Sequence, residues 1–260
     1  MRTGALVTGA GTRLGRAMAL KLAERGHAVA VHYNTSEGPA GDVADQIRDA
    51  GGTAVTIQAD LLDEAQTSAL VPAAAGALGL PLAVLINNAS IFEYDNIASA
   101  TRESWDRHVE SNLRAPFVLT QHFAAQAPDP DQDHRGEPVA SALVINMIDQ
   151  RVRKLTPEFM SYTIAKMGLW AFTQTAAQAL APKVRVNAIG PGPTMRGARQ
   201  SEAHFDAQRR ATILERGSDP EGIVEALEYF LIARAVTGQL LCVDGGQHLG
   251  WKTPDVLGPE

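Results

Sequence analysis

The chain has 260 residues, 45% of them hydrophobic, and a formal net charge of -6. Its length suits one large hydrophobic core, and its lack of a basic excess argues against a nucleic-acid partner. A single cysteine excludes an intramolecular disulfide framework and a metal site built from several cysteines. We expect a cytoplasmic protein without a membrane partner, because neither a signal-peptide pattern nor an apolar run of about eighteen residues is present.

Apolar runs with strand character alternate with segments of helical spacing along the chain. The predicted strands are residues 5–9, 27–33, 53–60, 81–90, 140–147, 183–192 and 238–246. The predicted helices are residues 14–26, 38–50, 64–78, 101–126, 158–180, 201–214 and 219–234. This alternation, without a linker or a shift in composition, predicts one α/β domain over residues 1–260. We expect a doubly wound Rossmann fold with a seven-stranded parallel sheet and helices on both faces.

The segment "PDPDQDHRGEP", residues 128–138, lies between a predicted helix and a predicted strand. Its prolines and charged residues predict a surface loop. Asp131, Asp133 and His134 are possible metal ligands, but nothing else in the sequence points to the same place. We therefore expect a solvated charged loop and no metal site.

The residues that follow the predicted strands are polar or rich in glycine: "TGAGTRLG", "HYNTS", "AD", "NNASIF", "NMID" and "GPGPT". Ligands of a doubly wound sheet bind beyond the carboxyl ends of its strands. These loops would line that one edge of the sheet, so we expect the binding site there.

The first of these loops, residues 8–15, opens a predicted helix. Its glycines allow a tight turn and a close approach of backbone amides to a pyrophosphate, and the helix N-terminus adds a partial positive charge. The dinucleotide fingerprint G-x-G-x-x-G is incomplete, because residue 14 is leucine. A plain strand-to-helix turn therefore remains an alternative for this segment alone.

The second loop, "HYNTS", lacks the carboxylate that commonly holds the ribose hydroxyls of NAD. His32, Asn34, Thr35 and Ser36 offer hydrogen-bond donors, and Arg13 adds a positive charge from the neighbouring loop. A carboxylate would repel a 2′-phosphate, whereas these groups would attract it. The sequence therefore predicts NADP(H) as the cofactor, with an ordinary polar turn as the alternative.

Tyr162 and Lys166 lie one turn apart on a predicted helix and share a face. A tyrosine has an ordinary pKa of about 10, so it needs a neighbour to act as an acid or base. We expect the Lys166 ammonium to lower the pKa of Tyr162 and to bind the nicotinamide ribose. The pair is a candidate for the catalytic centre.

The ordered motifs resemble the short-chain dehydrogenase/reductase family over nearly the whole chain, from "TGAGTRLG" to "VDGG" at residues 243–246. "NNAS" at residues 87–90, Asn112, the Tyr162–Lys166 pair and "PG" at residues 191–192 lie between them in the family's order. The resemblance implies a reductase that uses a nicotinamide cofactor and, by analogy, a homotetramer.

Two departures from the common pattern narrow this resemblance. Arg13 replaces a glycine and Asp149 replaces a serine. Together with the "HY" followed by serine and with Phe92 after "NNAS", they are similar to the pteridine reductase branch, including bacterial dihydromonapterin and dihydrofolate reductases.

The resemblance implies roles for residues at the predicted sheet edge. Asp60 and Leu61 would flank the adenine, and Asn112 would hold a water next to Lys166, with a helix–helix contact as the alternative. The expected cofactor contacts are Gly9, Arg13, Leu14, Gly15, His32, Tyr33, Asn34, Thr35, Ser36, Asp60, Leu61, Asn88, Ala89, Ser90, Met147, Tyr162, Lys166, Pro191, Gly192 and Thr194. The expected substrate contacts are Arg13, Ser90, Phe92, Asp149 and Tyr162, with Phe92 stacked on a flat heterocycle unless it serves core packing.

Asp149 ends a predicted strand and precedes Tyr162 by thirteen residues. A carboxylate is a poor partner for a developing alkoxide, because like charges repel, but it suits a ring with N–H groups. We predict that Asp149 and Tyr162 form one proton-donating unit that reduces a C=N bond of a pterin, dihydropterin or dihydrofolate. Burial should raise the pKa of Asp149. An aspartate that caps nearby amides is the alternative.

Two other functions fit the same fold. A general carbonyl reductase for 3-oxoacyl, sugar or alcohol substrates would more commonly have a serine at residue 149. A non-enzymatic dinucleotide sensor would be expected to lose Tyr162 or Lys166, and both are present. The polar segment at about 193–215 is expected to form a lid over the substrate.

Overall fold

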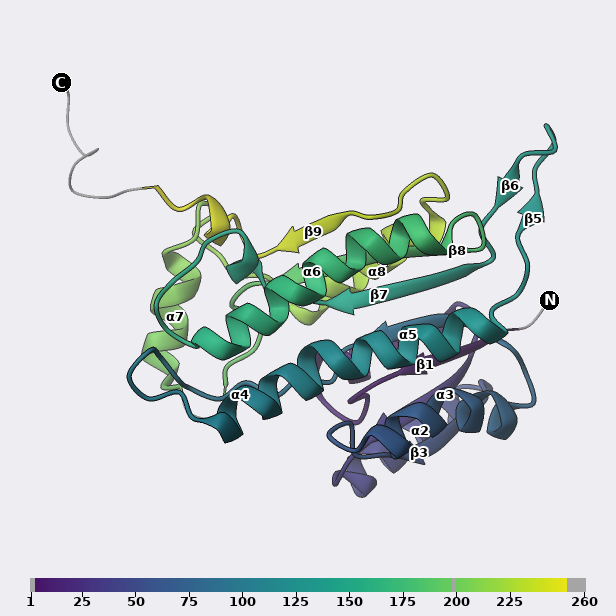
Figure 1. The fold of residues 1–260 in the computed structure, drawn as a ribbon, viewed down its shortest axis with the longest axis horizontal. Coiled ribbons are helices and arrows are strands. Elements are labelled where there is room, and N and C mark those ends of the chain that lie inside the picture. Colours follow the sequence, from purple (N-terminus) through teal and green to yellow (C-terminus); the bar gives the residue numbers. More distant parts are fainter. Residues whose placement is uncertain (1–2, 198–199, 252–260) are drawn as a thin grey trace.

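The computed structural model describes residues 3–197 and 200–251. Its main sheet has seven strands in the order β3-β2-β1-β4-β7-β8-β9, and every pairing in it is parallel (Figure 1). The predicted seven-stranded parallel sheet is thereby confirmed. The strands are β1 (Gly4–Val7), β2 (Ala28–Tyr33), β3 (Ala54–Gln58), β4 (Leu82–Asn87), β7 (Ala142–Met147), β8 (Val184–Pro191) and β9 (Leu240–Val243).

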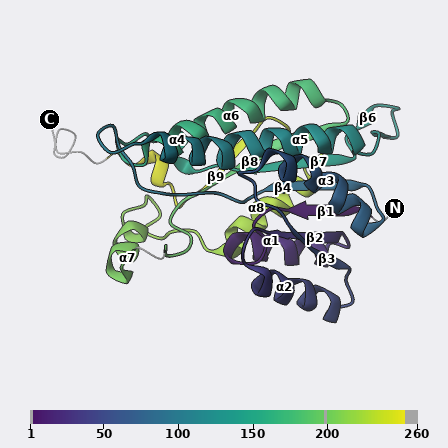
Figure 2. The same ribbon diagram turned by 60° about the horizontal axis from the view of Figure 1, so that its bottom comes forward.

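Helices cover both faces of this sheet, as Figure 2 shows. One face packs against α1 (Arg13–Glu24), α2 (Glu37–Asp49) and α8 (Pro220–Ile232). The other packs against α3 (Glu64–Leu78), α5 (Ala115–Gln126) and α6 (Met160–Leu180). The molecule is therefore a single-domain, doubly wound Rossmann fold.

The inner strands β1 and β4 are almost entirely apolar because both of their faces are buried. In β1, Ala5 and Val7 belong to the core under α1 and α8, whereas Leu6 between them belongs to the core under α3 and α5. Successive side chains of a strand point to opposite faces, so a strand covered on both sides needs apolar residues at every position.

The predicted helix at residues 101–126 consists of three parts: α4 (Arg102–Val109), a π-helical turn η1 (Glu110–Arg114) and α5. Thr101 starts α4 with a capping box, because its side chain accepts a hydrogen bond from Ser104 N. Pro116 lies in the first turn of α5 and has no N–H to continue the regular pattern. The wider turn that precedes it contains Asn112 and lies close to the expected site.

The surface loop predicted at residues 128–138 is partly ordered into a small hairpin, which corrects that prediction. Strand β5 (Asp131–Gln132) pairs antiparallel with β6 (Pro138–Val139). Asp133 Oδ1 accepts hydrogen bonds from the backbone N–H groups of Arg135 and Glu137 and so stabilises the turn. Within residues 3–197 and 200–251, no group of three or more histidine, cysteine, aspartate or glutamate side chains could hold a metal ion.

The remaining differences concern the ends of elements. The predicted helix at residues 201–214 is the shorter α7 (Glu202–Arg210), and two short 3-10 turns, η2 (Gln150–Val152) and η3 (Gln247–Leu249), follow β7 and β9. The strands point toward the side of the molecule where α7 lies, at the left of Figure 1. The loops after the strands therefore meet at this side. Among the described helices, none is long and apolar enough to cross a membrane.

Candidate active site

The turn between β1 and α1 brings two backbones very close together. Gly9 has a φ of 60°, in the region that favours glycine. A Cβ added at Gly15 would lie 2.2 Å from the carbonyl oxygen of Gly9 and 2.7 Å from Asn88 Nδ2. Glycine is therefore required at residue 15 for the helix to begin against the end of the strand.

Hydrogen bonds tie this turn to the loop after β4. Thr8 Oγ1 accepts from the backbone N–H groups of Asn88 and Ala89, both at 2.9 Å. Asn88 Nδ2 donates to the carbonyl oxygens of Thr8 at 2.8 Å and Gly9 at 3.1 Å. Sequence reasoning missed this role of Thr8, although a small polar residue directly after a buried strand was a visible signal for it.

Arg13 occupies a position with a φ of 53°, which explains why glycine is favoured there. Its guanidinium donates to the carbonyl oxygens of Met195, at 3.0 Å, and Arg196, at 2.9 Å. The side chain therefore joins the glycine-rich turn to the start of the predicted lid and keeps a positive charge at this edge.

The structure corrects the role predicted for His32. Its side chain is buried, with Nδ1 accepting from Gly9 N at 3.0 Å and Nε2 lying 3.1 Å from the carbonyl oxygen of Ala59. Burial lowers the pKa of His32 to about 4, so the ring is neutral at pH 7. His32 supports the glycine-rich turn and is not a free donor for a phosphate.

The end of β2 has no carboxylate of its own. Asn34, Thr35 and Ser36 are exposed there, and Tyr33 is half-buried. The nearest acid in this network is Asp60, whose Oδ1 accepts from Asn34 Nδ2 at 3.3 Å and from the backbone of the next loop. These exposed donors can meet a phosphate, while Asp60 is held back by its own hydrogen bonds.

Asp149 and Tyr162 form a direct pair. Tyr162 Oη donates to Asp149 Oδ2 at 3.1 Å, and the backbone N–H of Arg151 donates to the other carboxylate oxygen at 2.8 Å. Burial raises the pKa of Asp149 above its ordinary value, although the Arg151 N–H bond opposes this increase. The predicted direction is confirmed, and the pair joins a carboxyl group and a phenol that can exchange a proton.

The predicted lowering of the pKa of Tyr162 is wrong for this structure. Burial and the negative charge of Asp149 raise the pKa of the phenol well above its ordinary value, against weaker effects of Arg151 and Ser90. Lys166 Nζ instead donates to the carbonyl oxygen of Met147 at 2.8 Å and lies 5.6 Å from the Tyr162 ring centroid. Tyr162 is therefore held in its protonated form.

Lys166 is almost completely buried beneath the pair. Burial lowers its pKa to about 8, and the charge of Asp149 opposes this effect. Its ammonium group is directed to the end of β7 by the Met147 carbonyl. This geometry keeps a positive group close to the aspartate without a direct bond to the phenol.

Asn112 makes two hydrogen bonds that the sequence did not predict. It is fully buried in η1, its Oδ1 accepts from Ile91 N at 3.0 Å, and its Nδ2 donates to Ile91 O at 2.8 Å. Both ends of the side-chain amide therefore hold the loop after β4. The water predicted next to Lys166 stays a prediction.

Phe92 lies in an aromatic cluster at the mouth of the site. Its ring stacks on Phe159, with centroids 4.3 Å apart and planes inclined by 10°, and its edge contacts Tyr162 at 4.7 Å. Phe159 has a φ of 56°, and the Arg151 guanidinium lies 4.9 Å from its ring. Phe92 remains 44% exposed, so core packing does not account for all of its surface. Sequence reasoning missed Phe159, and its place directly before the tyrosine helix was the available signal.

The loop after β8 closes the site from the far end of the sheet. A Cβ at Gly192 would lie 2.5 Å from Asp244 Cβ, so only glycine fits between β8 and β9 at this point. Thr194 is buried, and its Oγ1 lies 2.6 Å from Ser218 Oγ. Pro191 and Gly192 therefore place their backbone rather than side chains at the expected nicotinamide end.

The expected lid at about 193–215 contains α7, and its residues 198–199 lie outside the described part of the chain. Arg209 fixes α7 to its surroundings by bonds to Pro193 O at 3.1 Å and Ser218 O at 2.6 Å, and to Asp219 Oδ1 at 3.0 Å. Of the other expected contacts, Leu14 lies in the first turn of α1, and Leu61, Ala89, Ser90 and Met147 lie on the loops or strand ends of this edge.

Known proteins are similar to this chain in both fold and sequence. A FolM alternative dihydrofolate reductase 1 from Brucella suis, solved in complex with NADP, is 41% identical, with a TM-score of 0.90 over 98% of each chain. A short chain dehydrogenase from Burkholderia cenocepacia, also solved with NADP, is 28% identical, with a TM-score of 0.85 over 94% of this chain and 97% of that chain. The 3-oxoacyl-acyl-carrier-protein reductase FabG from Staphylococcus aureus is 29% identical over 96% of this chain and 99% of its own length.

A family model for short chain dehydrogenases matches residues 3–206, which include the glycine-rich turn and the Asp149–Tyr162–Lys166 group. This match spans most of the chain and agrees with the strand order and the helices on both faces. The chain belongs to the short chain dehydrogenase family.

Proposed function

We propose that this protein is an NADPH-dependent reductase of a C=N bond in a pterin, dihydropterin or dihydrofolate. The direct bond between Tyr162 and Asp149 is the observation that supports this function most strongly. It pairs a protonated phenol with a carboxyl group of raised pKa at the point where the strands end. The FolM relative, which is named as a dihydrofolate reductase, supports the same substrate class.

The residues at the sheet edge fit NADP(H). Gly9 and Gly15 allow the close backbone packing of the turn before α1, and the N-terminus of that helix favours a negatively charged diphosphate. Exposed Asn34, Thr35 and Ser36 at the end of β2 would bind the 2′-phosphate, with the positive charge of Arg13 nearby. The end of β2 has no carboxylate that would repel a 2′-phosphate, and it therefore favours NADP(H) over NAD.

When bound, NADPH supplies a hydride to the ring carbon of the C=N bond. Tyr162 Oη then gives its proton to the adjacent nitrogen, so that one C–H and one N–H bond form in the product. Asp149 Oδ2, 3.1 Å away, returns a proton to Oη and otherwise accepts a hydrogen bond from a ring N–H. Lys166 balances the charge of this group from below. Asp149 takes this proton from solvent, and its raised pKa favours that uptake.

A general carbonyl reductase is the second candidate, and the similarity to FabG supports it. Asp149 is the observation against it, because a carboxylate next to Tyr162 would repel the alkoxide that forms from a ketone. A non-enzymatic sensor has less support, since a buried lysine and a buried tyrosine on α6 are costly to keep without a chemical role.

The test is a parallel assay of NADPH oxidation with biopterin, dihydrobiopterin, dihydromonapterin, dihydrofolate and a simple ketone. We expect turnover of at least one pterin or folate and much slower turnover of the ketone. Each active compound is then assayed with NADH in place of NADPH, and NADPH should be preferred. Turnover of the ketone alone would contradict the substrate class, and equal use of NADH would contradict the cofactor assignment.

A homotetramer is proposed on family analogy alone. Light scattering of the purified protein at several concentrations would test it, and a stable monomer at all of them would contradict it.

A further inference from the structure

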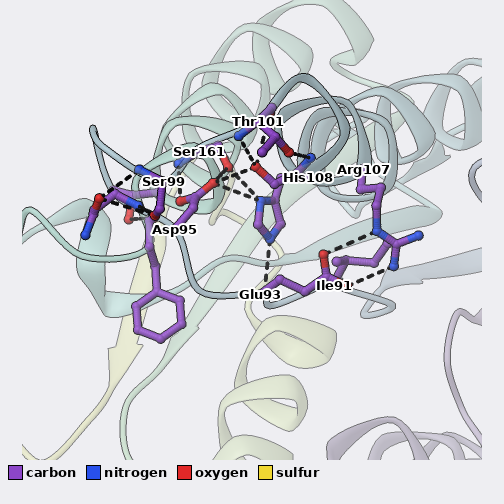
Figure 3. Close-up of polar contacts among 12 residues, drawn as sticks. Ile91, Glu93, Asp95, Ser99, Thr101, Arg107, His108 and Ser161 are labelled. Carbon is purple, nitrogen blue, oxygen red and sulfur yellow. Dashed lines mark hydrogen bonds and ion pairs between the residues drawn. The ribbon is translucent and has the colours of Figure 1, made fainter.

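A chain of buried polar side chains, Asp95, His108 and Ser161, lies beside the active site (Figure 3). His108 of α4, Asp95 of the loop after β4 and Ser161 of α6 each have an exposed fraction of 1% or less. His108 Nδ1 lies 2.7 Å from Ser161 Oγ, and Ser161 Oγ donates a short hydrogen bond to Asp95 Oδ2. Asp95 also accepts from Ser161 N at 3.1 Å and from Ser104 Oγ at 3.2 Å.

The hydrogen bonds fix the tautomer of His108. Its Nε2 accepts from the backbone N–H of Glu93 at 3.1 Å, so the ring proton is on Nδ1. Nδ1–H then donates to Ser161 Oγ, whose own hydrogen goes to Asp95. Burial lowers the pKa of His108, which keeps the ring neutral and Nε2 available as an acceptor.

The chain of polar side chains ends at the backbone of Glu93, one residue after Phe92. On the other side of Phe92, Asn112 holds Ile91 by two hydrogen bonds. His108 and Asn112 lie four residues apart on the same stretch of helix and are both fully buried. The backbone on each side of the aromatic ring is therefore fixed by one side chain from that stretch.

The polar side chains also contact the start of α6, directly before Tyr162. Ser161 precedes Tyr162, and Met160 N donates to the carbonyl oxygen of Asp95 at 3.3 Å. The His108 and Tyr162 rings are 5.9 Å apart in an edge-on arrangement. The loop that contains Phe92 and the start of α6 are thus held to each other through His108 and Asp95.

We propose that His108 is a positioning residue that fixes the Phe92 ring relative to the Tyr162 hydroxyl. The inference rests on the proposed function only for the identity of the substrate, because any flat substrate against Phe92 would depend on the same fixed ring. The bond from Glu93 N to His108 Nε2 is the part of the chain that matters for substrate binding, and the bond to Ser161 matters for the start of α6.

Three substitutions of His108 separate these two bonds. His108→Gln places an acceptor close to the position of Nε2, so it keeps the link to Glu93 and loses the link to Ser161. His108→Asn places its amide near Nδ1 and keeps only the link to Ser161. His108→Leu removes both. His27→Asn is the matched control, because His27 lies at the opposite end of the sheet, before β2, where its Nδ1 contacts Thr3 Oγ1.

The measurement is KM and kcat for each variant, with NADPH saturating, on the panel compound that the unchanged protein reduces fastest. We expect His108→Asn and His108→Leu to raise the KM for this compound by about tenfold, as loss of one buried acceptor would do, and to leave the KM for NADPH within about twofold. His108→Gln should stay within about threefold of the unchanged protein, and His27→Asn within about twofold.

A second comparison links the effect to Phe92. In a Phe92→Ala background, His108→Asn should raise the KM by less than about twofold, because the ring that it positions is gone. The inference is wrong if His108→Asn and His108→Gln raise the KM equally, if the effect is unchanged without Phe92, or if both variants only lower the melting temperature. If the histidine variants do not fold, Ser161→Ala is measured, which removes the side-chain bonds of Ser161 to His108 and Asp95 and keeps the bond from Glu93 N to His108 Nε2. Like His108→Gln, it should stay within about threefold of the unchanged protein in KM, and a larger increase would contradict the assignment of substrate binding to the Glu93 bond.

The two proposals fail in different places. An unchanged protein that reduces only the ketone contradicts the pterin assignment, and the histidine variants are then measured with the ketone. A pterin-reducing protein whose histidine variants keep their KM contradicts the positioning role and leaves the substrate assignment standing.

Discussion

The nucleotide side and the substrate side of the site are held together by different groups. Around β1 and β2, backbone atoms meet backbone atoms, and glycine is required where a Cβ would lie 2.2 Å from a carbonyl oxygen. Around α4 and α6, buried side chains hold a loop and a helix in place through Asp95, His108 and Ser161. The nucleotide side depends on glycine where two backbones meet and on side-chain bonds to the backbone, whereas the substrate side depends on a chain of side chains bonded to one another.

Loss of the Tyr162 hydroxyl should have the largest effect on turnover, and it should leave the nucleotide side unaffected. We expect Tyr162→Phe to lower kcat by about a thousandfold, because it removes the proton donor, and to change the KM for NADPH little. Steady-state kinetics with both substrates varied would check this. A loss of less than about tenfold would show that another group donates the proton.

Gly15→Ala should break the nucleotide side. The added Cβ would have to move the Gly9 carbonyl, at a cost of about 1–3 kcal/mol, so we expect a lower melting temperature and weaker NADPH binding. Gly41→Ala is the matched control, since nothing lies within 4 Å of its Cβ in α2. Thermal unfolding with and without NADPH measures both effects, and equal behaviour of the two variants would contradict the steric account.

His32 predicts a pH dependence of the same side of the site. Its pKa is about 4 in the folded protein and about 6.5 when unfolded, so the unfolded chain binds more protons and stability decreases as pH falls below about 6.5. The contribution of this residue should fall by about 2 kcal/mol between pH 7 and pH 5. Urea unfolding at both pH values compares the protein with His32→Asn, and an equal pH dependence in the two would contradict this role.

Phe92→Ala should have a much smaller effect on turnover than Tyr162→Phe. Loss of one aromatic stacking contact is worth about 0.5–1.5 kcal/mol, so we expect the KM for a pterin to rise by about three- to tenfold with kcat little changed. Its KM for a small aliphatic ketone should not change. An equal increase for both compounds would show that Phe92 supports the fold rather than a flat substrate.

The glycine-rich turn and the polar end of β2 could be predicted from the sequence because their signals are local. The strand runs, the turn with Gly9 and Gly15, and the polar end of β2 all follow from neighbouring residues. His32 was misassigned because it lies inside a strand with two buried faces, where a polar side chain must find partners within the core. Its position in the predicted strand at residues 27–33 already pointed to burial.

The substrate side could be predicted only in part. The positions of Asp149, Tyr162 and Lys166 were visible in the spacing, but the raised pKa of Tyr162 depends on which neighbour is closer in space. The contact of Asp95 with Ser161 joins residues that are far apart in the sequence and meet only when α4 packs against α6. No local pattern predicts such a contact.

The most direct test of the account is the substrate preference of Asp149→Ser. The variant removes the carboxylate next to Tyr162 and leaves the glycine-rich turn unchanged, so the KM for NADPH should stay within about twofold while kcat/KM for a pterin falls by about a hundredfold. The ratio of ketone to pterin turnover should rise accordingly. Unchanged pterin turnover in Asp149→Ser would contradict the proposal that this carboxylate selects a nitrogen heterocycle.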